Sequence, residues 1–245
     1  RTTDFTPQAI RDTVDAALSI ARFTAADECA GLADAELLAR SVPDLDLWHP
    51  RDLPVERAIE IARDCEAAGF AVDKRLSNSE GATVSTQGSH FIYGNSLGFL
   101  NGFPSTRHGV WCALVAGKND EMQRDEWYET SRDAADLPDA ASVGRRAGER
   151  AAHRLGARKI ATTQAPVLFE APVAASLIGH FVAAASGSAL YRHSSFLIDR
   201  LGTRVFAPGV DLDEDPFLPG EMASGYFDAE GVATSARRVV EDGYL

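Results

Sequence analysis

The sequence predicts an α+β fold in which helices pack on a mainly antiparallel sheet. Two amphipathic helical segments come first, near residues 7–23 and 55–69, and residues 70–130 are rich in Ser, Thr, Gly and aromatic side chains that alternate as in strands. Helices followed by a run of strands favour this class over repeating βαβ units. We expect residues 1–160 to form this domain. Residues 161–245 should begin a second, β-rich and barrel-like domain that contains a buried apolar helix.

The composition is that of an ordinary globular protein with an acidic surface. The 245 residues include 24 Lys and Arg against 36 Asp and Glu, which gives a net charge of −12. A chain of this length can bury a sizeable core without a metal or disulfide. Its charge disfavours a direct nucleic-acid partner. The absence of an apolar run of about 20 residues disfavours a membrane partner.

The first helix is predicted from its capping residues and its apolar stripe. Thr6 suits the N-cap and Pro7 the first helical position, and Phe5 is placed to form a hydrophobic staple with Ile10. The apolar residues then recur at helical spacing: Ile10, Val14, Ala17, Leu18 and Ala21.

Prolines punctuate residues 24–53, where Asp44–Trp48 alternates like a short edge strand. A second helix should follow Pro54 and end with Gly69 at the C′ position. Its expected buried residues are Val55, Ala58, Ile59, Ala62, Cys65 and Ala68.

Four strands are expected next, at residues 82–86, 89–93, 107–115 and 122–130, with a hairpin loop at Gly117–Asp120. A third helix should cover residues 140–155. Beyond residue 160 we expect a short buried strand at Pro166–Phe169, an apolar helix at residues 172–185, a further helix at residues 191–201 and strands within residues 224–245.

The common signatures of catalytic sites are absent from the sequence. Neither HExxH nor HExxxH occurs, and no Ser stands in a GxSxG elbow. Gly94–Gly98 is glycine-rich like a phosphate loop but lacks the GK[ST] ending, so a turn between strands is the simpler interpretation. The acidic residues 211–215 lack the glycine and terminal glutamate of a calcium loop. The three cysteines are odd in number and far apart, which predicts reduced thiols and a cytoplasmic location.

Two basic features remain open to two interpretations each. His180 lies on the apolar helix and is either a hydrogen-bonded core residue or a metal ligand. Arg107 and His108 follow Thr106 at the start of a strand. They could recognise a carboxylate or a peptide backbone, or Arg107 could form an ordinary surface salt bridge.

Longer stretches resemble the PmbA (TldE) branch of the TldD/PmbA metallopeptidase family. The similarity covers nearly the whole chain and includes Cys29–Asp34, Pro43–Leu47, Asp73–Arg75, Gly94–Ser96, Ser105–His108, Ala165–Phe169, Val173–His180, Gly187–Leu197, Leu201–Gly202, Ala223–Ser224 and Phe227–Val232. Members of this family extend further at both ends, so the sequence is expected to be an internal portion.

The resemblance implies a cytoplasmic bacterial peptidase in which TldD and TldE form a heterodimer that acts on peptides and small unfolded proteins. In the TldD branch an HExxxH helix and a later Cys bind zinc. The corresponding positions here are Gly179, His180 and Ala184, so we expect no metal ligand and no catalytic residue in this chain. Zinc is expected in the TldD-like partner. Substrate-cleft or interface positions are expected at Arg107, His108, Tyr191 and Arg192.

Three hypotheses follow for the function. The first is a TldE/PmbA-like subunit whose TldD-like partner supplies the metal and the general base. The alternative is a non-catalytic regulatory or binding protein in which the former active-site helix is structural. A third hypothesis, which no acidic neighbour supports, is an active peptidase that uses His180 and His193 as ligands.

Overall fold

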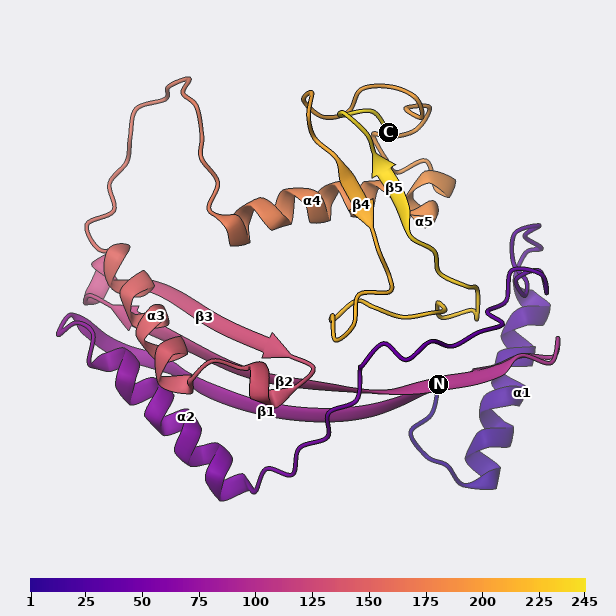
Figure 1. The fold of residues 1–245 in the computed structure, drawn as a ribbon, viewed down its shortest axis with the longest axis horizontal. Helices are drawn as coiled ribbons and strands as arrows, with labels where there is room; N and C mark the ends of the chain where they lie inside the picture. The colour runs from indigo at the N-terminus through magenta and orange to yellow at the C-terminus, as the bar shows by residue number, and fades with distance from the viewer.

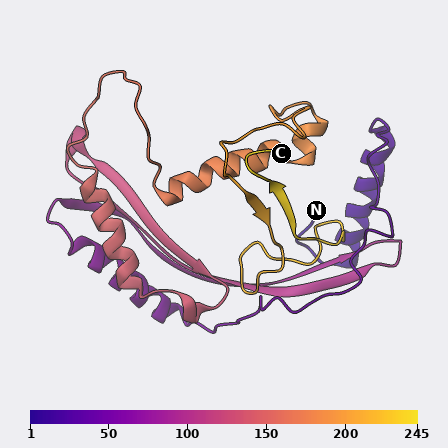
Figure 2. The same cartoon turned by 45° about the horizontal axis from the view of Figure 1, so that its top comes forward.

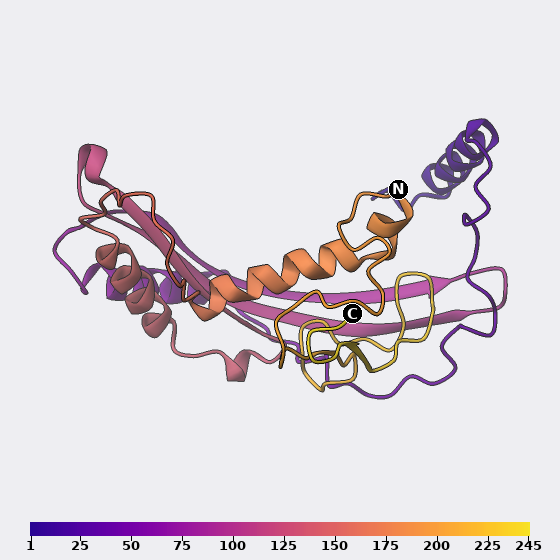
Figure 3. The same ribbon diagram turned by 90° about the horizontal axis from the view of Figure 1, so that it is seen from above.

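A long, curved, three-stranded antiparallel sheet organises the molecule, and the computed structural model describes all residues from 1 to 245 (Figures 1 and 3). Strands β1 (Leu76–Gly94), β2 (Leu100–Ala116) and β3 (Gln123–Ser131) lie in that order. The α+β class and the antiparallel pairing are confirmed. The two segments predicted at residues 82–86 and 89–93 are parts of one strand.

The turns between these strands follow from local side-chain chemistry. Between β1 and β2, the side-chain oxygen of Asn95 accepts hydrogen bonds from the backbone N–H groups of Leu97 and Phe99. Gly98 has a positive φ of 88°, which glycine adopts without strain. The glycine-rich segment is therefore a hairpin turn. Between β2 and β3, the predicted loop contains a 3₁₀ turn at Asn119–Glu121.

Helices α2 (Val55–Phe70) and α3 (Ala140–His153) cover the convex face of the sheet (Figure 2). Alternate residues of β2 point into this layer and form the main core: Val110, Cys112, Leu114 and Ala116, packed on Cys65, Leu76, Val143, Ala147 and Ala151. Gly69 does not end α2 as predicted, because the helix runs on to Phe70. A Cβ on Gly69 would lie 2.7 Å from the backbone oxygen of Gly144, so this glycine permits close helix packing instead.

Helix α1 (Pro7–Phe23) forms as predicted, and the Thr6 hydroxyl accepts from the N–H of Ala9. The predicted staple is wrong, since the Phe5 side chain is 84% exposed. None of the helix residues is buried. Its apolar stripe therefore has no covering surface within residues 1–245.

The extended segment around Leu47 is not a strand, but it does pack on the sheet edge. The backbone oxygen of Leu47 accepts from the N–H of Thr106 at 2.9 Å. Leu45 and Leu47 are buried with Tyr226 and Phe227 from the far end of the chain, against aromatic side chains that include Phe103 of β2. A segment near the C-terminus thus closes one end of the concave face.

The second part of the chain is less regular than expected. It contains α4 (Ala171–Ala185), α5 (Gly187–Tyr191), and the two-stranded sheet of β4 (Leu212–Glu214) and β5 (Arg237–Val240). The predicted buried strand at residues 166–169 is wrong: the segment is irregular and Leu168 is 98% exposed. The predicted helix at 191–201 is also wrong, because α5 ends at Tyr191. Residues 224–245 contain one short strand and isolated bridges.

The apolar helix lies on the concave side of the sheet, which is the side opposite α2 and α3 (Figure 2). Its length matches the prediction, but Phe181 is its one buried residue, packed with Leu197 and Val240. Apolar composition did not translate into burial because few other segments of residues 1–245 pack against it. No helix is both long enough and apolar enough to span a membrane.

Candidate functional site

Arg107 and His108 are neighbours on β2 and therefore point to opposite faces of the sheet. His108 lies across from Thr86 and Ser131 and faces the convex side. Arg107 lies across from Gln87 of β1 and faces the concave side. The two side chains predicted to act together are thus separated by the sheet itself.

His108 holds two segments of the chain together. Its side chain is 1% exposed, its Nε2 lies 2.9 Å from the backbone oxygen of His49, and its Nδ1 contacts the Thr86 hydroxyl. A neutral imidazole that donates from Nε2 and accepts at Nδ1 satisfies both contacts. In this chain His108 therefore has no free nitrogen and does not line a cleft.

Arg107 is exposed and forms no ion pair or side-chain hydrogen bond with this chain. Arg132 follows β3 directly, and the pairing of His108 with Ser131 brings it beside Arg107. Its Nη1 donates to the Thr106 carbonyl at 2.9 Å and its Nη2 to the Met222 carbonyl at 2.7 Å, while its Nε is enclosed without a partner. Burial, and then the positive charge of Arg107, lower the pKa of the Arg132 guanidinium.

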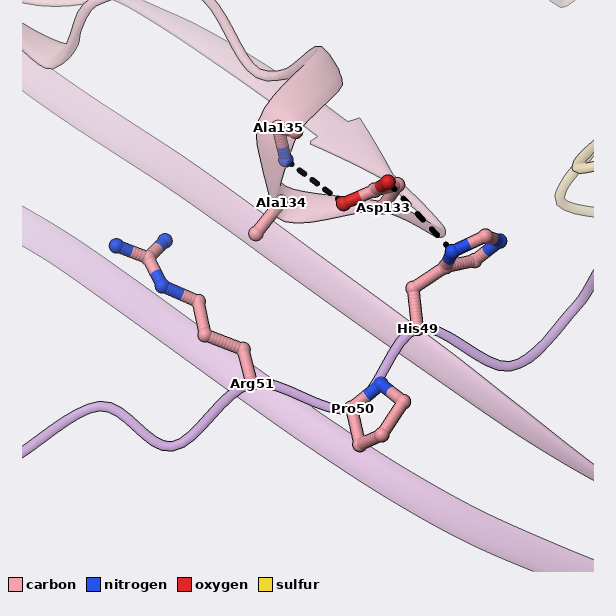
Figure 4. Close-up of a pocket in the computed structure, with 6 residues that line it drawn as sticks. All are labelled: His49, Pro50, Arg51, Asp133, Ala134 and Ala135. Carbon is pink, nitrogen blue, oxygen red and sulfur yellow. Dashed lines mark hydrogen bonds and ion pairs between the residues drawn. The ribbon is translucent and has the colours of Figure 1, made fainter.

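An open cavity of ≈ 500 Å³ lies where the His49–Arg51 segment meets the 3₁₀ turn Ala134–Asp136 (Figure 4). His49 lies between two carboxylates, with Nε2 at 3.2 Å from Asp46 and Nδ1 at 3.5 Å from Asp133. The other oxygen of Asp133 accepts from the N–H of Ala135 at 2.9 Å. Arg51 extends away from this pair. The polar groups here hold the segments together, and the residues that line the cavity include no Ser, Thr, Cys or Lys that could act as a nucleophile.

The three positions that the resemblance aligns with a metal helix lie on α4. Gly179 and His180 are exposed and Ala184 is half-buried. A zinc site needs three or four His, Cys or carboxylate ligands that converge on one point. No group of three such side chains converges anywhere in the chain. The residues of α4 therefore do not fit a zinc ion, and His180 and His193 do not form a site with a third ligand.

Tyr191 and Arg192 lie at the end of α5, away from the Arg107 region. The Tyr191 hydroxyl donates to Asp27 at 3.1 Å and its side chain is exposed. Arg192 is exposed as well. The structure thus assigns Tyr191 a contact with the segment after α1, and it does not bring these residues together with Arg107 or His108.

Sequence reasoning missed Arg132, which contributes the second positive charge on the concave side. Its position after a strand gave no sign that it would be half-buried. The strand register that places it beside Arg107 links residues 25 positions apart, and a single sequence does not reveal such a register. The one available signal was the pairing of two predicted strands across the Gly117–Asp120 hairpin.

Comparison with known families accounts for most of the chain. Residues 48–155 match the PmbA/TldA metallopeptidase central domain, and residues 162–245 match the PmbA/TldA metallopeptidase C-terminal domain. The chain is 44% identical over 243 residues to the metalloprotease PmbA of Escherichia coli O157:H7 and 40% identical over 244 residues to the PmbA homologue of Haemophilus influenzae. These two matches include 99% and 100% of this chain, which spans only 54% of the length of each relative.

Solved structures share the fold. A proposed modulator of DNA gyrase from Bacteroides thetaiotaomicron superposes with a TM-score of 0.91 at 24% identity, over 100% of this chain and 56% of that one. TldE from Thermococcus kodakarensis superposes with a TM-score of 0.67 at 17% identity, over 100% of this chain and 55% of that one. At these identities the likeness concerns the fold alone. The sequence matches and this shared fold together place the chain in the PmbA/TldD metallopeptidase family.

Proposed function

We propose that the chain is part of a TldE/PmbA-like subunit of a two-subunit peptidase, in which a TldD-like partner carries the zinc ion and the general base. The observation that carries this proposal is the state of α4. The chain belongs to a metallopeptidase family, yet Gly179, His180 and Ala184 stand at the positions that the resemblance aligns with zinc-binding residues. No set of metal ligands converges there. A subunit without a metal site needs a partner if it is to take part in proteolysis.

This chain would then contribute binding surfaces for the substrate and the partner, and no catalytic residues. Two surfaces are available within residues 1–245: the concave face of the sheet around Arg107, and the exposed apolar side chains of α4 on the same side of the sheet (Figure 2). We assign substrate handling to the first and contact with the partner to the second. The proposed location is the cytoplasm, where the three free thiols would stay reduced.

The test is to purify the full-length protein with and without its cellular TldD-like partner, and to measure zinc content and peptide cleavage in each preparation. We expect zinc to partition with the partner and cleavage to require both subunits. Stoichiometric zinc and full activity in the protein alone would refute the proposal.

The second candidate is a regulatory or binding protein with no role in proteolysis. The observation in its favour concerns His180, the one polar residue of α4 besides Ser176. It is exposed and belongs to no group of three His, Cys, Asp or Glu side chains that could hold a metal ion. The two candidates differ in one measurement. If cleavage by the partner is the same with and without this protein, the regulatory role without proteolysis is favoured.

A further inference from the structure

Two half-buried arginines have opposite surroundings. All other arginines of the chain are exposed. Arg150 forms ion pairs with Asp125 at 3.2 Å and with Glu170 at 2.7 Å. Arg132 forms none, and its guanidinium donates only to two neutral carbonyl oxygens. A positive charge that is removed from water without a counter-ion is unfavourable, so the Arg132 charge stands uncompensated.

The positions around Arg107 on the concave face add no negative charge. Its register neighbour on β1 is Gln87, and the next residues of β2 on the same face are Ser105 and Gly109. Thr130 lies across from Gly109 on β3. Arg107 itself is exposed, so two guanidinium groups, one accessible and one fixed, lie side by side next to these four neutral strand positions. In a protein of net charge −12 this is a local positive site.

An aromatic pair lies further along the same face. Trp111 and Tyr128 are direct cross-strand neighbours of β2 and β3, and the Tyr128 side chain is 59% exposed. Arg107 and Trp111 are four residues apart on one strand, which corresponds to about 13 Å at roughly 3.3 Å per residue. An extended peptide advances by the same amount per residue. It could therefore place a carboxylate at Arg107 and an apolar side chain about four residues away at the aromatic pair.

We propose that this face binds an extended peptide whose carboxylate pairs with Arg107. The fixed charge of Arg132 lies next to Arg107 and adds to the attraction, and an apolar side chain of the peptide packs on Trp111 and Tyr128. Arginine suits this task because its planar fork matches a carboxylate with two hydrogen bonds. The inference rests on the peptide-handling role proposed above and narrows the substrate class to peptides with a carboxylate and an apolar residue at that spacing. The carboxylate can belong to the C-terminus or to an acidic side chain.

The experiment measures binding of a fluorescent five-residue peptide to the full-length protein, with leucine at position one and aspartate at position five. Two further peptides separate the sources of the carboxylate: one has an amidated C-terminus, and one has asparagine in place of aspartate. Arg107→Gln should weaken binding about tenfold, the loss expected for one charge-assisted contact. Arg107→Lys should lie between, because it keeps the charge and loses the fork. Arg63→Gln on the convex side is the matched control, since Arg63 is also exposed and unpaired.

Several results would overturn the inference. Equal effects of Arg107→Gln and Arg63→Gln would show that only net charge matters. A peptide that has asparagine at position five and an amidated C-terminus carries neither carboxylate, and equal binding of this peptide would show that no anion is required. If inorganic phosphate competes as strongly as the unlabelled peptide, the site binds anions in general and not a peptide. If Trp111→Ala leaves the affinity unchanged, the aromatic pair takes no part in binding the peptide. The readout needs no zinc and no cleavage, so its failure is distinct from a failure of the two-subunit proposal, which the zinc partition decides.

Discussion

Gly144 of α3 packs directly against the backbone carbonyl of Cys65 in α2. A Cβ on Gly144 would overlap this carbonyl, and a Cβ on Gly148 would lie 2.6 Å from the backbone oxygen of Gly69. Glycines on both helices thus let the two backbones touch. This contact fixes how the helical layer sits on the convex face of the sheet.

The change Gly144→Ala should therefore destabilise the fold by roughly 1–2 kcal/mol, because direct overlap with backbone places the cost in the upper part of the roughly 1–3 kcal/mol that overpacking carries, and the helix propensity of Ala returns at most about 1 kcal/mol. Urea unfolding followed by circular dichroism measures this loss. Gly179→Ala in α4 is the matched control. Nothing lies within 4 Å of its Cβ position, so it should be neutral or stabilising. Equal behaviour of the two variants would contradict the packing argument.

The two neighbours on β2 should respond very differently to mutation. His108→Ala removes the partner of the His49 carbonyl and of the Thr86 hydroxyl inside the structure and leaves a cavity, so we expect a loss of roughly 2–4 kcal/mol. Arg107→Ala should change the free energy of unfolding by less than about 0.5 kcal/mol, because it is exposed and unpaired. If both variants unfold at the same urea concentration, the structural role of His108 is wrong.

The three thiols should fall into two classes of reactivity. Cys29 is exposed, whereas Cys65 and Cys112 are buried and touch each other. The hydrogen bond with Cys65, together with burial, raises the pKa of the Cys112 thiol, which disfavours its reactive thiolate. A chromogenic disulfide reagent should titrate one thiol in the native protein and all three in denaturant. Cys29→Ser should abolish the native reaction. Rapid native reaction of two or three thiols would contradict the burial of this pair.

Asp73 should contribute to the acid dependence of stability. Hydrogen bonds from Arg75 hold the pKa of its carboxyl at about 2, below its ordinary value of 3.8. A pKa that is lower in the folded state stabilises the fold fully above 3.8, and this contribution is lost as the pH falls through 2. Asp73→Asn should therefore reduce the fall in stability over that window, as measured by urea unfolding at several pH values. Arg75→Gln should do the same, because it removes the donor. Unchanged pH profiles in both variants would refute the assignment.

His180 should be dispensable for the chemistry of a peptidase complex. Its side chain is exposed on α4, and it does not belong to any group of three side chains that could hold a metal ion. His180→Ala should leave both the zinc content and the cleavage rate of the two-subunit preparation unchanged. A parallel loss of zinc and activity would instead identify His180 as a ligand.

Much of the structure of residues 1–160 could be predicted from local patterns. The capping residues Thr6 and Pro7, the helical spacing around Cys65 and the alternation along β2 each act over a few residues, and the corresponding elements formed. Of the six residues expected to be buried in α2, however, only Cys65 is, and Val55 and Ile59 are exposed. The failures came where long-range contacts decide. Residues 166–169 are apolar enough for a buried strand, yet no neighbouring strand lies beside them. Gly69 was expected to end a helix, but a glycine is needed there because α2 packs closely against Gly144 of α3.

The candidate site shows the same division. The sequence by itself determined the family, the absence of an HExxxH motif from the segment that includes Gly179, His180 and Ala184, and the presence of a cation beside an imidazole at residues 107 and 108. Only the tertiary structure decided that the sheet separates these two side chains, that His108 is enclosed, and that Arg132 lies beside Arg107 without a counter-ion. The physical reason is that burial and charge pairing are properties of groups brought together by strand register. One strand's pattern records which of its faces is apolar, but not which residues of other segments lie against it.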